Sequence, residues 1–264
     1  MAVALRPPVA SATFPEMRTL ISYAAMVVMT IGLAVPILLL TLFGVRLDPD
    51  GVLGRGAYWW SKIVLRVTGV PVQVINPERI AHGESRVYMS NHVSWWEIFA
   101  LASVLPHFRM IGKKEISKIP LFGPAAGAVA AVWIDRKNRR TAFAAYEEVV
   151  PQVKAGLSVG VFPEGTRGFS YELRPFKKGP FVLAIAAQVP VVPVVSYGSL
   201  EIQKKGDVLI HPHPIELTFL EPIPTAGMTY DDRDRLIERC WHAMADELEK
   251  RGVQSRGAPV EAAT

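Results

Sequence analysis

An uncharged, apolar segment near the N-terminus constrains this chain of 264 residues more than any other feature. From Thr19 to Val45 no residue is charged, and as an α-helix a segment of this length would extend about 40 Å. The hydrocarbon layer of a bilayer is about 30 Å thick, so the segment is long enough to cross it. A signal peptide has a shorter apolar region, of about 7–15 residues. We therefore expect a membrane anchor.

Residues within and beside this segment indicate how it would lie relative to the membrane. Gly32 and Pro36 lie in its middle, so the segment either crosses with a kink or bends back without crossing. Residues 54–70 mix aromatic and basic side chains, which is typical of the headgroup layer, although an amphipathic helix packed on the next domain has the same pattern. Basic residues are denser after the apolar segment than before it. This bias predicts attachment to the cytoplasmic membrane, with the remaining chain on the cytoplasmic side.

The charge balance and the cysteine count limit the other possibilities. The net charge of +5 suits an anionic partner, such as a nucleic acid, a phosphorylated metabolite or an acidic membrane surface. The single cysteine, Cys240, excludes an internal disulfide and a cysteine-based zinc cluster. It falls on the apolar stripe of a predicted C-terminal helix, so we expect a buried thiol.

From about Val70 the sequence alternates between strand and helix patterns. This alternation predicts an α/β fold with a mixed, mostly parallel sheet flanked by helices. The expected strands are 70–76, 86–91, 130–135, 158–165, 189–196, 207–211 and 215–220, and the expected helices are 95–105, 141–156 and 180–188.

These patterns divide the chain into four parts. Residues 1–69 form the anchoring helices and residues 70–225 form the α/β domain. Residues 226–252 contain a final helix, which begins with a capping box of Thr229 and Asp232. The small and polar residues 253–264 are expected to be disordered.

A histidine and a carboxylate follow the second expected strand. His92 and Glu97 can meet only if His92 lies in the loop and Glu97 in the first helical turn, because five helical residues turn by about 500°. Ser94 then fits as the N-cap residue of a capping box. The simpler interpretation is that Glu97 only caps the helix and that His92 is an ordinary loop residue.

Cations follow other strands. Residues 162–168 bring Glu164, Thr166 and Arg167 into one glycine-containing turn, Arg136 follows the strand at 130–135, and Lys113 lies in Gly-Lys-Lys. Because parallel strands end at one edge of a sheet, these cations could form an anion pocket there. Each of them could equally be an ordinary surface charge.

Four blocks of the sequence resemble one known family. NHVSWWE (91–97), AVWIDR (131–136), FPEGTR (162–167) and VPVVPV (189–194) are similar, in order and spacing, to the motifs of the glycerolipid acyltransferases. Residues 112–123 resemble the segment before the second block, and the likeness covers roughly residues 70–225. Glu97 stands where aspartate is commonest, and Trp133 where phenylalanine is usual.

The resemblance implies a glycerol-3-phosphate acyltransferase-like fold and an acyl transfer to the free hydroxyl of a lysophospholipid. The most probable acceptor by resemblance is 1-acylglycerol-3-phosphate, and the donor is an acyl-CoA or acyl-ACP. His92 would be the general base, and Glu97 would orient its ring. Other residues would bind the glycerol phosphate: Lys113, Arg136, Glu164, Gly165, Thr166 and Arg167. The resemblance implies no metal and no cofactor besides the acyl thioester.

Other functions remain open from the sequence. The acceptor could be another lysolipid, such as a lyso-ornithine lipid, or the chain could be a catalytically silent lipid-binding protein. Ser158 lies in a G-x-S-x-G pattern typical of esterases, with Asp207 and His211 after it, but a helix precedes it and a strand follows, which reverses the usual context. The expected partners are membrane lipids, the two substrates and, for a carrier-protein donor, acyl carrier protein. We expect no nucleic-acid partner.

Overall fold

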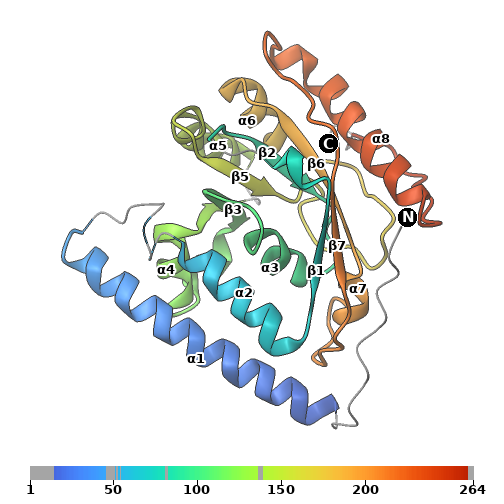
Figure 1. Ribbon diagram of the computed structural model, residues 1–264. Helices are drawn as coiled ribbons and strands as arrows, with labels where there is room; N and C mark the ends of the chain where they lie inside the picture. The colour runs from blue at the N-terminus through green and yellow to red at the C-terminus, as the bar shows by residue number, and fades with distance from the viewer. Residues whose placement is uncertain are drawn as a thin grey trace.

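The structure is a computed structural model that describes residues 15–45, 51, 53, 55–80, 83–135 and 139–260. One seven-stranded sheet lies at its centre, and helices cover both faces (Figure 1). The strand order is β1-β7-β6-β2-β5-β3-β4, in which β6 and β7 are antiparallel and the other neighbouring pairs are parallel. The strands are β1 (Val72–Ile75), β2 (Val87–Ser90), β3 (Phe108–Lys113), β4 (Ala131–Ile134), β5 (Ser158–Val161), β6 (Val191–Tyr197) and β7 (Ile215–Phe219). The predicted mixed, mostly parallel sheet is confirmed.

Two sets of helices enclose this sheet. α5, α6 and α8 pack on one face, where Val87 and Met89 of β2 point, and α2 and α3 pack on the other, where Tyr88 points. α1 packs against α2 and α4 (Figure 1). The helices are α1 (Pro15–Leu42), α2 (Gly56–Thr68), α3 (Trp96–Ala102), α4 (Phe122–Val129), α5 (Arg139–Lys154), α6 (Gly179–Ala187), α7 (Ser199–Ile202) and α8 (Arg233–Glu249), with short 3-10 turns η1 (Pro77–Arg79), η2 (Lys114–Lys118) and η3 (Tyr230–Asp232).

Two strand predictions differ from the structure. β3 was not expected, and it is found between β5 and β4. Residues 207–211 were expected to be a strand, but they form none. The amide of Ile210 donates to the hydroxyl of Thr19 in α1 at 3.0 Å, and that of His211 donates to the carbonyl of Ile202 at 2.9 Å. The backbone of this segment is therefore satisfied outside the sheet.

In the C-terminal region the structure contains the predicted helix, but its tail differs from the prediction. Thr229 and Asp232 form the predicted capping box, and Cys240 is fully buried on the inner face of α8. The prediction of disorder is wrong for residues 253–260. The hydroxyl of Ser255 accepts the Leu173 amide at 3.0 Å, and the Pro259 carbonyl accepts the Phe176 amide at 2.9 Å. Residues 261–264 lie outside the described residues.

The parallel strands also place the catalytic candidates. β2, β5 and β6 are neighbours, so the segments that follow them meet at one edge of the sheet. The Asn91 side chain, directly after β2, donates to the Ser196 carbonyl at 2.9 Å and accepts the Ser196 amide at 2.7 Å. These two bonds fix the end of β2 to β6, immediately before His92.

Candidate active site

His92 and Glu97 lie side by side in the structure. His92 lies in the loop after β2 and Glu97 in the first turn of α3, and His92 Nδ1 is 2.6 Å from Glu97 Oε2. Glu97 is fully buried, and the amides of Val93 and Ser94 donate to its carboxylate at 2.9–3.1 Å. Because a carboxylate only accepts hydrogen bonds, His92 Nδ1 carries the hydrogen and Nε2 is the basic nitrogen. This arrangement suits proton abstraction.

Ser94 has a different partner from the one predicted. The N-cap of α3 is Trp95, and the Ser94 hydroxyl donates to the carbonyl of Gln203 at 2.6 Å instead of capping the helix. Of the two hydrogen bonds that make a capping box, only the one from the Ser94 amide to the Glu97 carboxylate is present. The predicted N-cap is wrong because the hydroxyl finds an acceptor across the fold.

The turn after β5 holds His92 from two sides. Glu164 Oε1 accepts the backbone amide of His92 at 2.8 Å, and the Gly168 amide donates to the His92 carbonyl at 2.7 Å. The ring of Phe162 stacks on the imidazole, with centroids 3.8 Å apart and planes 9° apart. The first and third blocks of the sequence therefore form one site.

Glu164 faces the protein backbone and not the solvent. Its second oxygen accepts Arg174 Nε at 3.1 Å, so both oxygens have partners and the residue is buried. Burial raises the pKa of Glu164 to about 7, against the lowering effect of the hydrogen bonds from His92 and Arg174. The resemblance implies that Glu164 binds the glycerol phosphate, whereas the structure uses its carboxylate to position the histidine loop.

Arg167 provides the cation beside this pair. Its guanidinium lies over the ring of Trp95 at 4.8 Å, and Nη1 is buried without a hydrogen-bond partner among the described residues. Burial lowers the pKa of Arg167, and the charge of Glu97 opposes this change. An unpaired guanidinium donor next to a histidine–carboxylate pair is suited to a phosphate.

Four other residues were predicted to bind the phosphate: Gly165, Thr166, Lys113 and Arg136. Thr166 is exposed in the same turn, and Gly165 adopts a left-handed conformation with φ of 78°. Lys113 lies at the end of β3, about half exposed, and pairs with Glu115 at 3.5 Å. Arg136 lies outside the described residues. The structure thus brings Arg167, Thr166 and Gly165 to the histidine loop and leaves Lys113 at its surface position.

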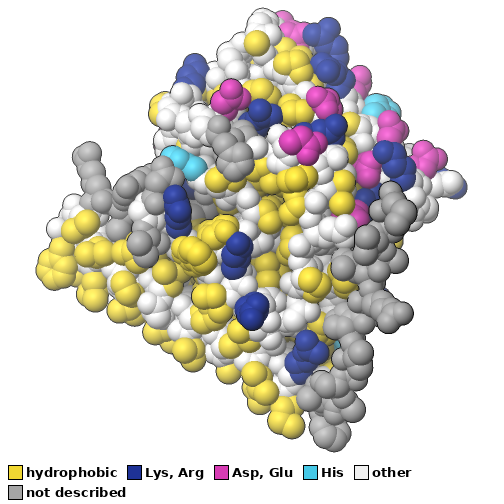
Figure 2. Space-filling view, in the orientation of Figure 1, with side chains coloured by type: hydrophobic (Ala, Val, Ile, Leu, Met, Phe, Trp, Pro, Cys, Tyr) yellow, Lys and Arg dark blue, Asp and Glu magenta, His cyan; other side chains and the backbone are white. Residues whose placement is uncertain are grey.

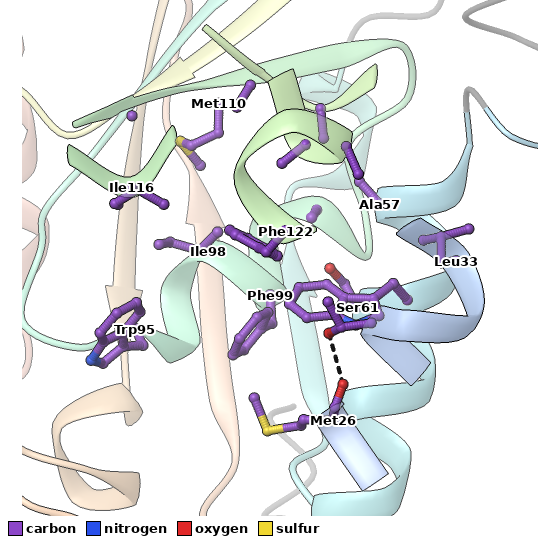
Figure 3. A pocket seen from close by; sticks show the side chains of 18 of the residues that line it. Met26, Leu33, Ala57, Ser61, Trp95, Ile98, Phe99, Met110, Ile116 and Phe122 are labelled. Carbon is purple, nitrogen blue, oxygen red and sulfur yellow. Dashed lines mark hydrogen bonds between the residues drawn. The ribbon is translucent and has the colours of Figure 1, made fainter. Parts of the chain in front are cut away.

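An apolar cavity of about 520 Å³ opens beside the site (Figure 3). Side chains from α1, α2, α3 and α4 line it together with residues of β3 and β4, among them Leu33, Ala57, Phe99, Met110 and Phe122. Trp95, which carries Arg167 on its ring, also lines this cavity. The cation and the apolar space therefore share one side chain.

Two features that the sequence suggested belong to no site. The Ser158 hydroxyl is buried at the start of β5 and accepts the Arg86 amide at 3.1 Å, so it is not placed as an esterase nucleophile. The second feature is the pair of histidines His211 and His213, which are two positions apart in the sequence and could suggest a metal site. Within the described part of the chain, no group of three or more His, Cys, Asp or Glu side chains could hold a metal ion.

Some residues of the site had no signal, or only a weak one, in the sequence. The Ser199 hydroxyl donates to Glu97 Oε1 at 2.6 Å, although 102 positions separate the two residues. Arg174, which binds Glu164, lies beyond the third block. Asn91 could have been found, because it directly precedes His92 in the first block.

The raised pKa of Glu164 predicts a pH dependence of stability. The unfolded carboxyl ionises near 4.5 and the folded one near 7, so the folded protein binds an extra proton between these values. Stability from this group is therefore present below about pH 4.5 and is lost as the pH rises through 7, by up to about 3 kcal/mol. Relative to Glu164→Gln, the free energy of unfolding of the wild type should fall between pH 5 and pH 8 in denaturant titrations. A difference that stays constant across this range would contradict the assignment.

Comparisons with known proteins show the family to which the chain belongs. A family model described as Acyltransferase matches residues 71–197. The chain is 33% identical to human 1-acyl-sn-glycerol-3-phosphate acyltransferase beta, over 70% of this chain and 68% of that protein, and 31% identical to the human alpha protein, over 72% and 68%. The fold is similar to that of the LPA acyltransferase PlsC from Thermotoga maritima, with a TM-score of 0.76, 22% identity and coverage of 91% of this chain and 97% of that one. The chain belongs to the glycerolipid acyltransferase family.

Proposed function

We propose that this protein transfers an acyl chain from a thioester to the free hydroxyl of 1-acylglycerol-3-phosphate, giving phosphatidic acid. One observation carries the proposal: the His92–Glu97 pair lies next to an unpaired Arg167 donor, which in turn adjoins a large apolar cavity. A base, an anion ligand and an apolar space are what a phosphate-bearing lipid and an acyl thioester require together. The names of the human relatives support the same acceptor.

The reaction follows from the geometry of the pair. His92 Nε2 removes the proton from the acceptor hydroxyl as its oxygen attacks the thioester carbonyl. The carbon–sulfur bond then breaks, and the thiolate leaves and takes the proton from the imidazolium. Glu97 stabilises the imidazolium and keeps Nε2 as the free nitrogen. A silent lipid-binding protein would have no need of this buried pair.

The phosphate and the acyl chain have separate places. Arg167 would bind the phosphate through its free donor, with Arg136 and Lys113 as further cations, while Gly165 and Thr166 shape the turn. The apolar cavity between α1 and α4 would hold the acyl chain, because about 520 Å³ of space with few polar side chains favours a hydrocarbon. The thioester, from CoA or acyl carrier protein, is the second substrate, and the step uses no metal or other cofactor.

We also propose that α1 lies in the plane of the cytoplasmic membrane, with the catalytic domain on the cytoplasmic side. α1 is long and apolar enough to cross a bilayer, but residues near both of its ends are buried against the domain. Arg18 donates to the Thr68 carbonyl at 3.1 Å near one end, and Ile37 is buried near the other. A spanning helix would have to leave these contacts.

The outer side of α1 fits such a surface. It exposes many large apolar side chains, and Figure 2 shows hydrophobic residues gathered along the edge of the molecule that α1 forms. These exposed residues of α1 include Leu20, Ile21, Val27, Val28, Ile31, Leu39 and Leu42. Trp59 and Ile63 of α2 are also exposed. Membrane lipids would cover this surface.

Product analysis tests the reaction. Purified protein with acyl-CoA or acyl-ACP and a panel of lysolipids, including a lyso-ornithine lipid, should form mainly phosphatidic acid from lysophosphatidate. Glu97→Gln keeps one acceptor oxygen, replaces the other by an amide donor and loses the charge beside His92, so kcat should fall about a thousandfold or more. Ser94→Ala is the control, since it should cost about 1 kcal/mol of stability and leave kcat nearly unchanged. Normal turnover by Glu97→Gln would refute the proposed base.

A second experiment tests the phosphate ligand. Arg167→Ala should raise KM for lysophosphatidate roughly ten- to a hundredfold, because a charged hydrogen bond of about 1.5–3 kcal/mol is lost, and Arg167→Lys should raise it less. Lys204 is an exposed cation in the nearby segment after α7, and Lys204→Ala serves as the matched control. If both Arg167 variants behave like this control, the guanidinium is only a surface charge.

A third experiment tests the orientation of α1. Cys240 is fully buried, so a single new cysteine can be labelled over a low background. In sealed membrane vesicles, a membrane-impermeant maleimide should reach Glu16→Cys and Val45→Cys from the same side, because both ends of an in-plane helix face one compartment. Labelling of the two positions from opposite sides would show that α1 spans the membrane.

A further inference from the structure

Ser199 is a buried hydroxyl that lies outside all four motif blocks and contacts the centre of the site. It is the first residue of α7, directly after the β6–α7 turn, and it is fully buried. Its Oγ donates to Glu97 Oε1 at 2.6 Å. A bond this short, from a neutral hydroxyl to a buried carboxylate, is among the stronger hydrogen bonds in proteins.

The turn before Ser199 is held rigidly. Gly198 adopts a left-handed conformation with φ of 92°, and a Cβ there would collide with the Pro214 carbonyl oxygen. The Tyr171 hydroxyl accepts the amides of Gly198 and Leu200 at 2.7 and 3.0 Å and donates to Glu201 at 2.6 Å. Ser199 lies between these two anchored amides, so its hydroxyl has a fixed position.

The two oxygens of Glu97 have different tasks. Oε2 pairs with His92 Nδ1, whereas Oε1 accepts the amide of Ser94 and the hydroxyl of Ser199, and the Val93 amide donates to both oxygens. The two amides belong to the same loop as His92 and would move with it. Ser199 donates from α7, which follows β6 and is separate from the His92 loop. It therefore fixes the rotation of the Glu97 carboxylate relative to the rest of the fold.

We infer that Ser199 is a positioning residue for the proposed reaction, and that it acts by holding the Glu97 carboxylate in the orientation that directs His92 Nε2 at the acceptor. This role rests on the proposed function, because it concerns the same base. Ser199 reaches neither substrate, so its loss should alter turnover and not substrate binding.

The chain offers a matched control three residues earlier. Ser196 is also a fully buried serine, at the end of β6, and its hydroxyl has no hydrogen-bond partner among the described residues. Replacing either serine by alanine removes one buried oxygen, but only Ser199→Ala removes a bond to the catalytic pair.

The test compares steady-state kinetics and melting temperatures of Ser199→Ala, Ser199→Thr and Ser196→Ala in the full-length protein. We expect Ser199→Ala to lower kcat about tenfold, with KM for both substrates unchanged. Ser199→Thr keeps the hydroxyl and should restore most of kcat. Ser196→Ala should retain the wild-type kcat. If Ser199→Ala does not fold, Ser199→Cys takes its place, because the thiol has a similar shape but is a weaker donor, and its kcat should lie below that of the wild type.

Two results would overturn this inference. One is a Ser199→Ala or Ser199→Cys variant with the wild-type kcat. The other is a rise in KM that accounts for the whole loss of activity. His92→Ala, measured in parallel, separates the two proposals. Normal turnover by His92→Ala would refute the proposed function itself, whereas an inactive His92→Ala beside a fully active Ser199→Ala would refute only the role of Ser199.

Discussion

The buried carboxylate of Glu97 is the interaction on which the site depends. A charge without solvent costs several kcal/mol unless hydrogen-bond donors surround it. Here the donors are the Val93 and Ser94 amides and His92 Nδ1 of the preceding loop, and the Ser199 hydroxyl at the start of α7. The carboxylate is therefore solvated by protein only when the loop after β2 and the turn after β6 are assembled. The same assembly orients His92, so the proposed base is preorganised as the protein folds.

A second layer of contacts holds the histidine loop from the side of β5. Glu164 and Gly168 bind the two backbone groups of His92, and Arg174 in turn binds Glu164. These contacts form because β2 and β5 are parallel neighbours, which brings the ends of both strands to one edge. A glutamate that the family resemblance assigns to the phosphate thus binds the backbone of His92, while Arg167 Nη1 is a buried donor without a partner among the described residues.

The apolar α1 has two roles that its composition does not separate. Its inner side lines the cavity through residues such as Met26, Leu33 and Ile37, and its outer side exposes residues such as Val28 and Leu39. The helix is thus one wall of the proposed acyl site as well as the surface that we propose to contact the membrane. This arrangement joins the anchor to the catalytic domain, because removing α1 would open the cavity to water.

The sequence by itself determined the elements whose causes are local. The apolar runs of β2, β5 and β6, the capping box of η3 before α8 and the spacing of His92 to Glu97 depend on neighbours within a few positions. The order of the four motif blocks, which resembles the family, can also be read from the sequence alone. Only the tertiary structure decided the rest. It placed β3 within the sheet, left residues 207–211 out of it, gave Ser94 a carbonyl partner across the fold and brought Ser199 to Glu97. The physical reason is that these features depend on partners outside the segment itself, 109 positions away for Ser94 and 102 for Ser199, and no local pattern encodes which buried polar groups will meet.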